Sequence, residues 1–348
     1  MVGPGRTHYG LPRTEFDAVT SMQIGNVLVA GSANLDFVVR ANHVPAPGET
    51  VLGREFGMFP GGKGANQAVA CTRAGGARTR MLVALGEDAH AVPIEASLRA
   101  AGVELEIVRS AQHATGTAFI CVSDEAENAI TVAPGANDAL RPEHLPGLSG
   151  VGHLLLQLET PLDTVEAYAH TARAAGVAVA LNAAPARVLP ATLLALVDVL
   201  IVNEGELAIV AGIDGDVATC LARIAVPCVI VTLGARGCCA RVDGDGTDAL
   251  LLQPAFPVHA VDTTAAGDTF CGVLVAALGR GAELAAALRE ASAASALACT
   301  RPGAQSSIPA RAEVEALLAA NTDRRAGALE ALADACGLPR PDAGPATT

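Results

Sequence analysis

Apolar residues in the second half of the chain follow two alternating spacings. Short apolar runs bounded by turn-forming residues predict strands, and the longer segments between them have helical spacing. The expected strands are residues 154–158, 177–181, 199–202 and 229–233, and the expected helices are residues 161–175, 193–196, 268–278 and 284–300. This alternation is typical of βαβ units and predicts a mostly parallel sheet covered by helices. A short β-meander over residues 238–252 interrupts the series.

The first half of the chain has a different pattern. Residues 37–39 and 50–52 are strand-like runs on either side of a Pro-Ala-Pro-Gly turn at residues 45–48. Further strand-like runs occupy residues 81–85, 118–122 and 129–132. We therefore expect a three-layer α/β fold with a mostly parallel central sheet and a small β-lid, the lid being formed by residues 35–60 and 115–133.

The two ends of the chain lack this periodicity. Residues 1–23 contain Gly and Pro without regular apolar spacing and predict a disordered N-terminal tail, with Met22 as an alternative start. Residues 24–320 are expected to form the folded domain. Residues 321–348 are rich in Ala, Pro, Asp and Arg, and are expected to be a dispensable C-terminal tail that is helical in part at most.

Composition and charge exclude several classes of protein. Of the 348 residues, 51% are hydrophobic and 17% are charged, which excludes a disordered chain. The net charge of −13 argues against a nucleic-acid partner. Residues 1–23 have no apolar core of a secretory signal, and the longest apolar stretch, residues 193–202, is too short to span a membrane. The nine cysteines form no C-x-x-C pair and are interpreted as buried or free thiols, which suits a cytoplasmic protein.

Two clusters of small residues stand at predicted helix starts. Gly61-Gly62-Lys63-Gly64-Ala65-Asn66 precedes a segment of helical spacing that ends before Gly75-Gly76. Glycines there let the backbone approach a ligand, helix N-terminal N–H groups are free to donate, and Asn66 can reach a polyhydroxyl ligand. The cluster has neither P-loop nor dinucleotide-binding spacing, so a simple tight turn remains an alternative.

The second cluster, Ala265-Ala266-Gly267-Asp268, enters another predicted helix. Its backbone N–H groups and the helix dipole can form an anion hole for a phosphoryl group in transfer. Asp268 can then remove a proton from an attacking hydroxyl. The alternative is an ordinary first-turn Asp that only stabilises the helix dipole.

Long sequence strings around both clusters resemble a known family. GGKGANQAVA at residues 61–70 and VDTTAAGDTF at residues 261–270 resemble the two signatures of the ribokinase family of carbohydrate and nucleoside kinases. Further strings are similar to those of its ribose-phosphorylating members, and the resemblance extends over residues 25–320. These strings are GSANLD, PAPGET, TVAPGAN, QLETPL, LNAAPAR and TRPGAQSSIP.

The resemblance implies an activity, a set of site residues and two metal ions. The implied reaction is ATP-dependent phosphorylation of the 5-hydroxyl of D-ribose with Asp268 as general base. The residues implied for sugar binding are Asn34, Asp36, Gly62, Lys63, Asn66, Glu159 and Asp268. Those implied for ATP are Asn203, Thr232, Gly234, Gly237, Ala265, Ala266 and Gly267, with Glu206 holding Mg²⁺ through water. Those implied for an activating K⁺ are Asp262, Thr264, Ala298, Arg301, Gly303 and Ser307.

Several alternatives stay open at this point. Ser292 stands where some members of the family have a His beside the adenine, which leaves nucleotide preference open. Arg301 is equally typical of a surface charge and Ser307 of a polar residue next to a helix. The sugar can be deoxyribose or another furanose or nucleoside, and a catalytically silent sugar-binding protein is a further reading. The family also implies a homodimer formed through the lid.

Overall fold

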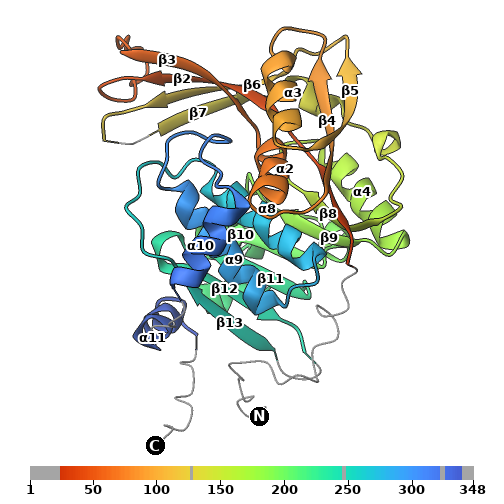
Figure 1. Cartoon of the computed structure of the whole chain (residues 1–348), viewed down its shortest axis with the longest axis vertical. Helices are drawn as coiled ribbons and strands as arrows, with labels where there is room; N and C mark the ends of the chain where they lie inside the picture. The colour runs from red at the N-terminus through yellow and green to blue at the C-terminus, as the bar shows by residue number, and fades with distance from the viewer. Residues whose placement is uncertain (1–23, 126–127, 245–247, 322–325, 339–348) are drawn as a thin grey trace, which may run out of the picture.

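The computed structural model describes residues 24–125, 128–244, 248–321 and 326–338. The expected N-terminal tail, residues 1–23, lies outside the described residues, as does the chain from residue 339 onward. Figure 1 shows a large α/β body from which a second, smaller sheet projects at one end.

In the described chain, the central sheet has nine strands in the order β13-β12-β11-β10-β9-β8-β1-β4-β5. The strands from β11 to β5 are parallel, and β12 and β13 extend the sheet as an antiparallel pair. This confirms the mostly parallel sheet and the β-meander. The bounds are β1 Asn26–Ala30, β4 Thr79–Gly86, β5 Glu104–Ser110, β8 Val151–Leu156, β9 Ala178–Asn182, β10 Val199–Asn203, β11 Cys228–Thr232, β12 Gly237–Val242 and β13 Ala249–Pro254.

Helices cover both faces of this sheet, which confirms three layers. Along β1, Val27 and Val29 belong to one apolar core, and Leu28 and Ala30 belong to the other. Such alternation is expected of a strand buried on both faces. The first core lies under α2 Lys63–Arg73, α3 Ala91–Ala100, α8 Ala266–Gly279, α9 Leu284–Ala298 and α10 Arg311–Ala320. The second lies under α4 Leu162–Ala174, α5 Ala191–Leu194, α6 Glu204–Ala211, α7 Val217–Leu221 and α11 Ala326–Ala335.

The smaller sheet is the expected lid. Its four strands in the described chain have the order β3-β2-β6-β7, with bounds β2 Asn34–Arg40, β3 Glu55–Gly61, β6 Gly116–Val122 and β7 Asn128–Ala133. β2 follows β1 after only three residues, so the chain passes directly from the central sheet into the lid. β2, which begins at Asn34, therefore runs from the junction with the body into the lid (Figure 1).

One expectation was wrong. Residues 50–52 form a loop, and the strand lies later, at Glu55–Gly61, where it pairs in register with β2. The β-branched residues of this loop do not make a strand, because no strand of the described chain pairs with them, and the Leu52 side chain is exposed to solvent. The C-terminal segment is helical in part, since α11 covers Ala326–Ala335, and Leu332 of α11 and Cys336 just after it belong to the second core. That this segment is dispensable stays a prediction.

The two helices that begin at the small-residue clusters, α2 and α8, pack in close contact. A Cβ on Gly272 of α8 would lie 2.5 Å from the carbonyl oxygen of Gln67 in α2, so only glycine allows this approach. One turn further along α2, Cys71 Sγ donates to the carbonyl oxygen of Gly272 at 3.2 Å. The glycine contact fixes the separation of the two helices in their N-terminal halves.

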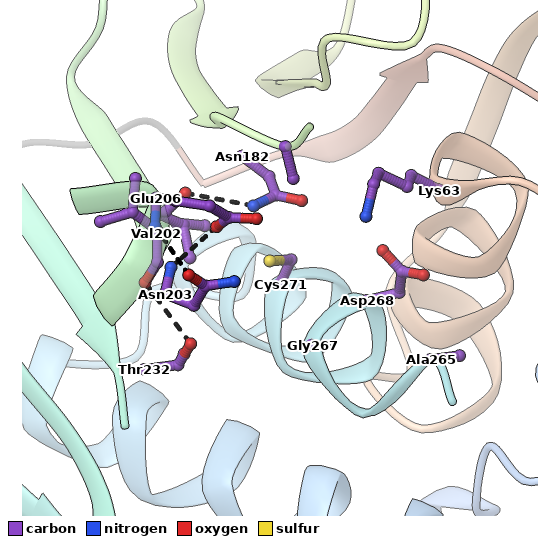
Figure 2. A pocket seen from close by; sticks show the side chains of 12 residues that line it. Lys63, Asn182, Val202, Asn203, Glu206, Thr232, Ala265, Gly267, Asp268 and Cys271 are labelled. Atoms are coloured by element: carbon purple, nitrogen blue, oxygen red, sulfur yellow. Dashed lines mark hydrogen bonds between the residues drawn. The ribbon is translucent and has the colours of Figure 1, made fainter. Parts of the chain in front are cut away.

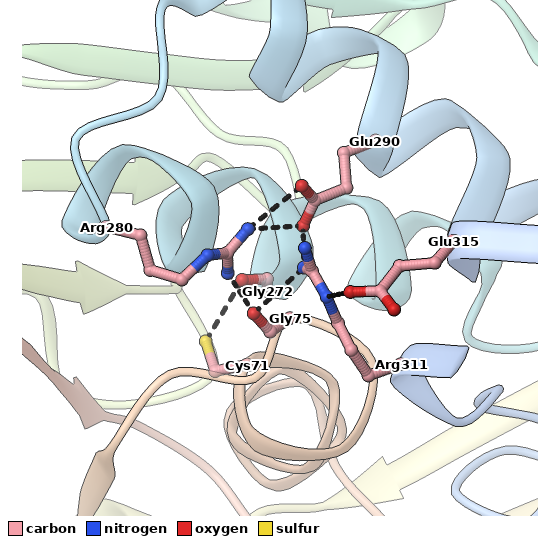
Figure 3. A network of polar contacts seen from close by, with 7 residues as sticks. All are labelled: Cys71, Gly75, Gly272, Arg280, Glu290, Arg311 and Glu315. Atoms are coloured by element: carbon pink, nitrogen blue, oxygen red, sulfur yellow. Dashed lines mark hydrogen bonds and ion pairs between the residues drawn. The ribbon is translucent and has the colours of Figure 1, made fainter. Parts of the chain in front are cut away.

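An ion-pair network fixes the other end of the same helix pair (Figure 3). Arg280 and Arg311 both donate to the carbonyl oxygen of Gly75, just after α2. Both guanidinium groups also contact the Glu290 carboxylate, with Arg280 Nη2 2.6 Å from Glu290 Oε1, and Arg311 Nε donates to Glu315 Oε1 at 2.8 Å. This network ties the C-terminal end of α2 to α9 and α10.

The adjacent cysteines of β12 point to opposite faces of the sheet. Cys238 lies in the first core, where its Sγ is 3.7 Å from Ser292 Oγ, and Cys239 lies in the second core, in hydrogen-bond contact with Cys336. All nine cysteines belong to the described chain and are free. The interpretation as free or buried thiols is thereby confirmed. In the residues that the structure describes, no helix is both long and apolar enough to cross a membrane.

Candidate active site

The N-terminal ends of α2 and α8 meet at the ends of β9, β10 and β11, where they enclose a cavity of about 160 Å³ (Figure 2). Strand ends of a parallel sheet are where α/β folds bind ligands. The cavity is lined by Lys63, Asn182, Ala184, Ile201, Val202, Asn203, Glu206, Thr232, Ala265, Gly267, Asp268 and Cys271. Seven of the residues expected from the sequence therefore line one cavity.

Asp268 lies in the first turn of α8 and is buried. Asn66 Nδ2 donates to Asp268 Oδ2 at 2.9 Å, and Gln67 Nε2 donates to Asp268 Oδ1 at 3.0 Å. Both donors come from the first turns of α2, so the close packing of the two helices brings the carboxylate and its partners together. The carboxylate is held on both oxygens before any ligand binds.

The start of α8 has the geometry of an anion site. Ala265, the N-cap, is in the left-handed region at φ 58°, which turns the chain sharply into the helix. The N–H of Ala266 donates to Thr263 and that of Thr269 donates to Ala265. For the N–H groups of Gly267 and Asp268, the described chain provides no backbone acceptor outside the helix. These two groups, at the positive end of the helix dipole, remain free to bind an anion.

The residues expected to bind a sugar meet where the lid joins the body. Asn34 Oδ1 accepts from Asn137 Nδ2 at 2.8 Å, so its own amide nitrogen is left to donate. Asn66 Oδ1 is buried without a partner in the described chain, so it is left to accept. Glu159 Oε2 accepts from the backbone N–H of Lys63 at 3.1 Å, and Gly62 is the N-cap of α2. The arrangement offers donors and acceptors side by side, as a polyhydroxyl ligand requires.

Two charged side chains of this region have shifted pKa values. Burial, with smaller contributions from the charges of Glu159 and Asp268, raises the pKa of Asp36 to about 7. For Lys63, burial lowers the pKa, but the carboxylates of Asp268, Glu159 and Glu206 outweigh burial and raise it overall. Lys63 thus stays protonated between three carboxylates, and Figure 2 shows its amino group extending toward Asp268.

The opposite wall of the cavity is formed by the start of α6. Asn203 Oδ1 accepts from the N–H of Glu206 at 2.8 Å, and Glu206 Oε2 accepts from the N–H of Asn203 at 2.8 Å. This capping box fixes both side chains on one turn, where Figure 2 shows them. Burial raises the pKa of Glu206, a shift that the Asn203 hydrogen bond and Lys63 oppose. Thr232 Oγ1 donates to Val202 at 3.4 Å, and Gly234 and Gly237 form the turn that follows β11.

The loop before α8 contacts the loop after α9. Asp262 Oδ1 accepts from the N–H of Thr264 at 2.9 Å, and Asp262 Oδ2 accepts from the N–H of Gly303 at 2.8 Å. Although burial raises the pKa of Asp262, these hydrogen bonds lower it overall. Three of the residues expected to hold a monovalent cation are thus brought together.

The other three expected residues have different contacts. The Arg301 guanidinium pairs with Glu313, and its backbone N–H donates to the carbonyl oxygen of Ala298 at 3.3 Å. Ser307 Oγ donates to the carbonyl oxygen of Ala304 at 2.8 Å. The side chains of Arg301 and Ser307 are therefore engaged locally, so a cation at this site would use backbone oxygens there.

Several buried amides of the site were not singled out from the sequence. Gln67, Gln157 and Asn182 form a chain of contacts that ends at Asp268, and Asn137 orients Asn34. All four lie inside strings that resemble the family, but a buried amide has no spacing signal of its own. In the described residues, no cluster of three or more His, Cys, Asp or Glu is suited to hold a metal ion directly.

The profile of one family, "pfkB family carbohydrate kinase", matches residues 25–311. The chain belongs to the pfkB family of carbohydrate kinases. Among its relatives, the ribokinase of Haemophilus influenzae is 38% identical, with 82% of this chain and 95% of that protein covered. The deoxyribokinase of Salmonella typhi is 32% identical, with 85% of this chain and 99% of that protein covered.

Solved structures agree with this assignment. Arabidopsis thaliana ribokinase, determined in complex with ribose and ATP, is 32% identical, with a TM-score of 0.76 over 85% of this chain and 99% of that one. The pfkB-family fold of a mostly parallel sheet with a small lid is therefore shared by this chain. The match also agrees with the family suggested by the strings around Lys63 and Asp268.

Proposed function

We propose that the protein is an ATP-dependent kinase that phosphorylates the 5-hydroxyl of D-ribose. The observation that carries the proposal is Asp268, a buried carboxylate at a helix N-terminus, held by Asn66 and Gln67 beside the charged Lys63. Similarity to ribokinases at 38% identity, and to a relative solved with ribose and ATP, supports this substrate pair.

In the proposed reaction, Asp268 accepts the proton of the sugar hydroxyl as that oxygen attacks the γ-phosphorus. The new oxygen–phosphorus bond forms while the bond to the leaving ADP breaks. The free N–H groups of Gly267 and Asp268, which the Ala265–Gly267 turn presents at the start of α8, stabilise the negative charge on the transferred group. Lys63, which lines the cavity and interacts electrostatically with Asp268, Glu159 and Glu206, adds a positive charge.

The donor sets fit the two metal ions of the proposal. Asn203, Glu206 and Thr232 provide side-chain oxygens on the phosphate side, and one carboxylate suits an ion that keeps most of its water shell. Glu206 would hold Mg²⁺ through water, and the ion would supply charge neutralisation at the phosphates. Asp262, fixed between the loops of Thr264 and Gly303, would hold K⁺ together with backbone oxygens of Ala298, Arg301, Gly303 and Ser307. That site would shape the anion hole without touching the substrate.

A second candidate keeps the mechanism and changes the sugar. The deoxyribokinase of Salmonella typhi is nearly as similar as the ribokinases, which supports deoxyribose as the alternative acceptor. Ribose is preferred because Asn34, Asp36 and Asn66 provide a dense set of hydrogen-bonding groups, and each absent hydroxyl would leave one of them unpaired at a cost of about 1 to 3 kcal/mol.

We also propose a homodimer that pairs through the lid, in a cytoplasmic enzyme. The lid exposes a group of large apolar side chains that a monomer would leave in water: Phe56, Met58, Phe59, Phe119, Ile130 and Val132. Light scattering at micromolar concentration should give the mass of two chains. A mass of one chain would contradict this part of the proposal.

The test of function is a coupled assay of ADP release over a panel of sugars, with and without K⁺. We expect the highest kcat/KM with ribose, a lower value with deoxyribose, and faster turnover with K⁺. Asp268→Asn, purified in parallel, serves as the control for contaminating kinases. Sugar binding without ADP release from the wild-type protein would instead identify a silent binding protein.

A further inference from the structure

A chain of buried amides runs from the sheet to Asp268. Gln157 Nε2 donates to Gln67 Oε1 at 2.7 Å, and Gln67 Nε2 donates both to Asp268 Oδ1 and to Asn182 Oδ1, each at 3.0 Å. Asn182 Nδ2 donates to the carbonyl oxygen of Ile201 at 3.1 Å. Resting on the function proposed above, we infer that Gln67 is the positioning residue of the catalytic base, set in its orientation by Asn182 and Gln157.

The orientation of each amide in this series of hydrogen bonds is determined by the backbone carbonyl group at one end of the series. The backbone carbonyl of Ile201 can only accept, so Asn182 must turn its nitrogen toward it and its oxygen toward Gln67. Gln67 must then present its nitrogen to that oxygen, and the second hydrogen of the same nitrogen reaches Asp268. If the Gln67 amide were rotated by half a turn, its oxygen would face two other acceptors, Asn182 Oδ1 and Asp268 Oδ1. The amide that faces Asp268 is therefore a donor by necessity.

Burial makes this arrangement rigid. Gln67 is fully buried, and Gln157 and Asn182 are nearly so, so water does not compete for their hydrogen bonds. A Cβ on Gly31 would lie 1.8 Å from Gln157 Oε1, so the Gln157 amide is packed directly against the backbone of β1's end. Gln67 is fully buried and both of its side-chain polar atoms already have partners, so its role is to hold Asp268 and not to contact a ligand.

The two oxygens of Asp268 then have different tasks. Oδ1 points to the fully buried Gln67, whereas Oδ2 points to Asn66, whose own oxygen is unpartnered on the sugar side. Oδ1 is the anchored oxygen, and Oδ2 is the one that takes the proton of the hydroxyl. Loss of the anchor lets the carboxylate rotate away from the line of attack, and small misplacements of a reacting group cost about 100-fold in rate.

The test compares Gln67→Met with a matched variant on the same helix. Gln67→Met keeps the volume and removes all three side-chain hydrogen bonds of Gln67, so kcat should fall about 10- to 100-fold while KM values for ribose and ATP change less than about threefold. Cys71→Ala, one turn along on the face against α8, removes a contact with Gly272 and should leave kcat unchanged. Equal losses of kcat in both variants would assign the effect to helix packing and overturn the inference.

A double mutant separates positioning from structure. In the Asp268→Asn background, measured by single-turnover assay at high enzyme concentration, Gln67→Met should cause no further loss, because there is no base left to position. The same loss in both backgrounds would overturn the inference. So would a Gln67→Met enzyme with kcat within twofold of wild type. If the wild-type protein phosphorylates no sugar, the proposed function itself fails, which is a different result.

Gln67→Glu provides a second readout if Gln67→Met does not fold. The introduced carboxyl group can donate to Asp268 only while it holds a proton. We therefore expect kcat of this variant to be nearest to wild type at low pH and to fall as pH rises, whereas wild-type kcat does not fall in that range. A pH profile parallel to that of the wild-type enzyme would overturn the inference.

Discussion

At the scale of single residues, the site depends on polar groups that the fold has buried and paired in advance. Asp268 has a partner on each oxygen, and Asn34 has its amide direction set by Asn137. Asn66 Oδ1 and Gln157 Oε1 are among the exceptions, because both atoms are buried without a hydrogen-bond partner in the described chain. Buried polar atoms are costly when unpaired, and Asn66 is one of the residues proposed to bind the sugar, so we expect a ligand hydroxyl to donate to Asn66 Oδ1.

Asp268→Asn tests the proposed base. The amide is nearly isosteric, but it cannot take the proton, so kcat should fall at least about 100-fold while ribose and ATP still bind. Stopped assays give kcat, and calorimetry gives both dissociation constants. Turnover within about tenfold of wild type, with both ligands bound, would show that another group is the base.

Asp36 gives a pH-dependent prediction about stability. With a folded-state pKa of about 7 against an ordinary value of 3.8, the folded protein keeps a proton that the unfolded chain loses between these pH values. Titration of Asp36 therefore lowers the free energy of unfolding of the wild-type protein by about 1.4 kcal/mol per pH unit between about pH 4 and about pH 7. Above about pH 7 this contribution levels off. Asp36→Asn removes the dependence, so its stability relative to wild type should grow over that range.

Urea denaturation of both proteins at pH 5, 6, 7 and 8 measures this difference in the free energy of unfolding. The gain from Asp36→Asn should be larger at pH 7 than at pH 5 and similar at pH 7 and 8. A difference that does not change with pH would contradict the raised pKa of Asp36.

At the scale of elements, the site depends on how closely α2 approaches α8. Gly272 is the contact point, and the network of Arg280, Arg311 and Glu290 holds the far end of α2 (Figure 3). Because Asn66 and Gln67 belong to α2 and Asp268 to α8, the distance between the helices sets the hydrogen bonds to the proposed base. The same pair of helices thus carries both a close packing contact and the proposed catalytic residue.

Gly272→Ala should disturb that distance. Its Cβ would lie 2.5 Å from the carbonyl oxygen of Gln67 and 2.7 Å from Ala70 Cβ, so the helices must separate at a cost of about 1 to 3 kcal/mol. We expect a lower Tm together with a fall in kcat that exceeds the change in either KM. Gly327→Ala, in α11, is the control, because its Cβ would meet nothing within 4 Å. Equal behaviour of the two variants would refute the close-contact argument.

Elements were predictable from the sequence where periodicity was strong. β8 to β11 and the helix α4 followed from alternating apolar runs. β5 was not expected, because its sequence ELEIVRS is charged and only half-buried at the sheet edge. β3 was misplaced, because Gly, Met and Pro within Glu55–Gly61 weaken its strand signal. Both strands depend on pairing with a neighbouring strand, β2 for β3 and β4 for β5, more than on the strand propensity of their own residues.

The site was predictable in part for a related reason. Asp268, Lys63 and Glu206 could be found because each stands at a helix start within a recognisable string. Gln67, Gln157 and Asn182 could not, because each makes its contacts with residues roughly a hundred positions away, as Gln67 does with Asn182 and Gln157. A buried amide gains meaning only when the fold supplies its partners.

At the scale of the whole molecule, α11 lies beyond the part of the chain that the family profile matches, which ends at residue 311. α11 places Leu332 in the second core, and the N–H of Ala218 in α7 donates to the carbonyl oxygen of Cys336, just after α11, at 3.0 Å. This segment thus packs on the same half of the molecule as the strands β10 to β12.

Leu332→Ala tests whether α11 stabilises the fold. Removal of a buried leucine side chain typically costs about 2 to 5 kcal/mol, so thermal unfolding should shift clearly to lower temperature. Glu330→Ala, at an exposed position of the same helix, should leave Tm nearly unchanged. Equal Tm values for Leu332→Ala and wild type would show that residues 326–338 do not stabilise the fold, as expected for a dispensable tail.

The two neighbouring cysteines of β12 have a practical consequence. Cys238 and Cys239 are consecutive in sequence but face opposite cores, one beside Ser292 and the other beside Cys336. An alkylating reagent reaches each thiol only when the layer that covers it opens. The rates at which the two are labelled, read by mass spectrometry of a single peptide, therefore report the opening of each helical layer separately, without any probe having to be engineered into the protein.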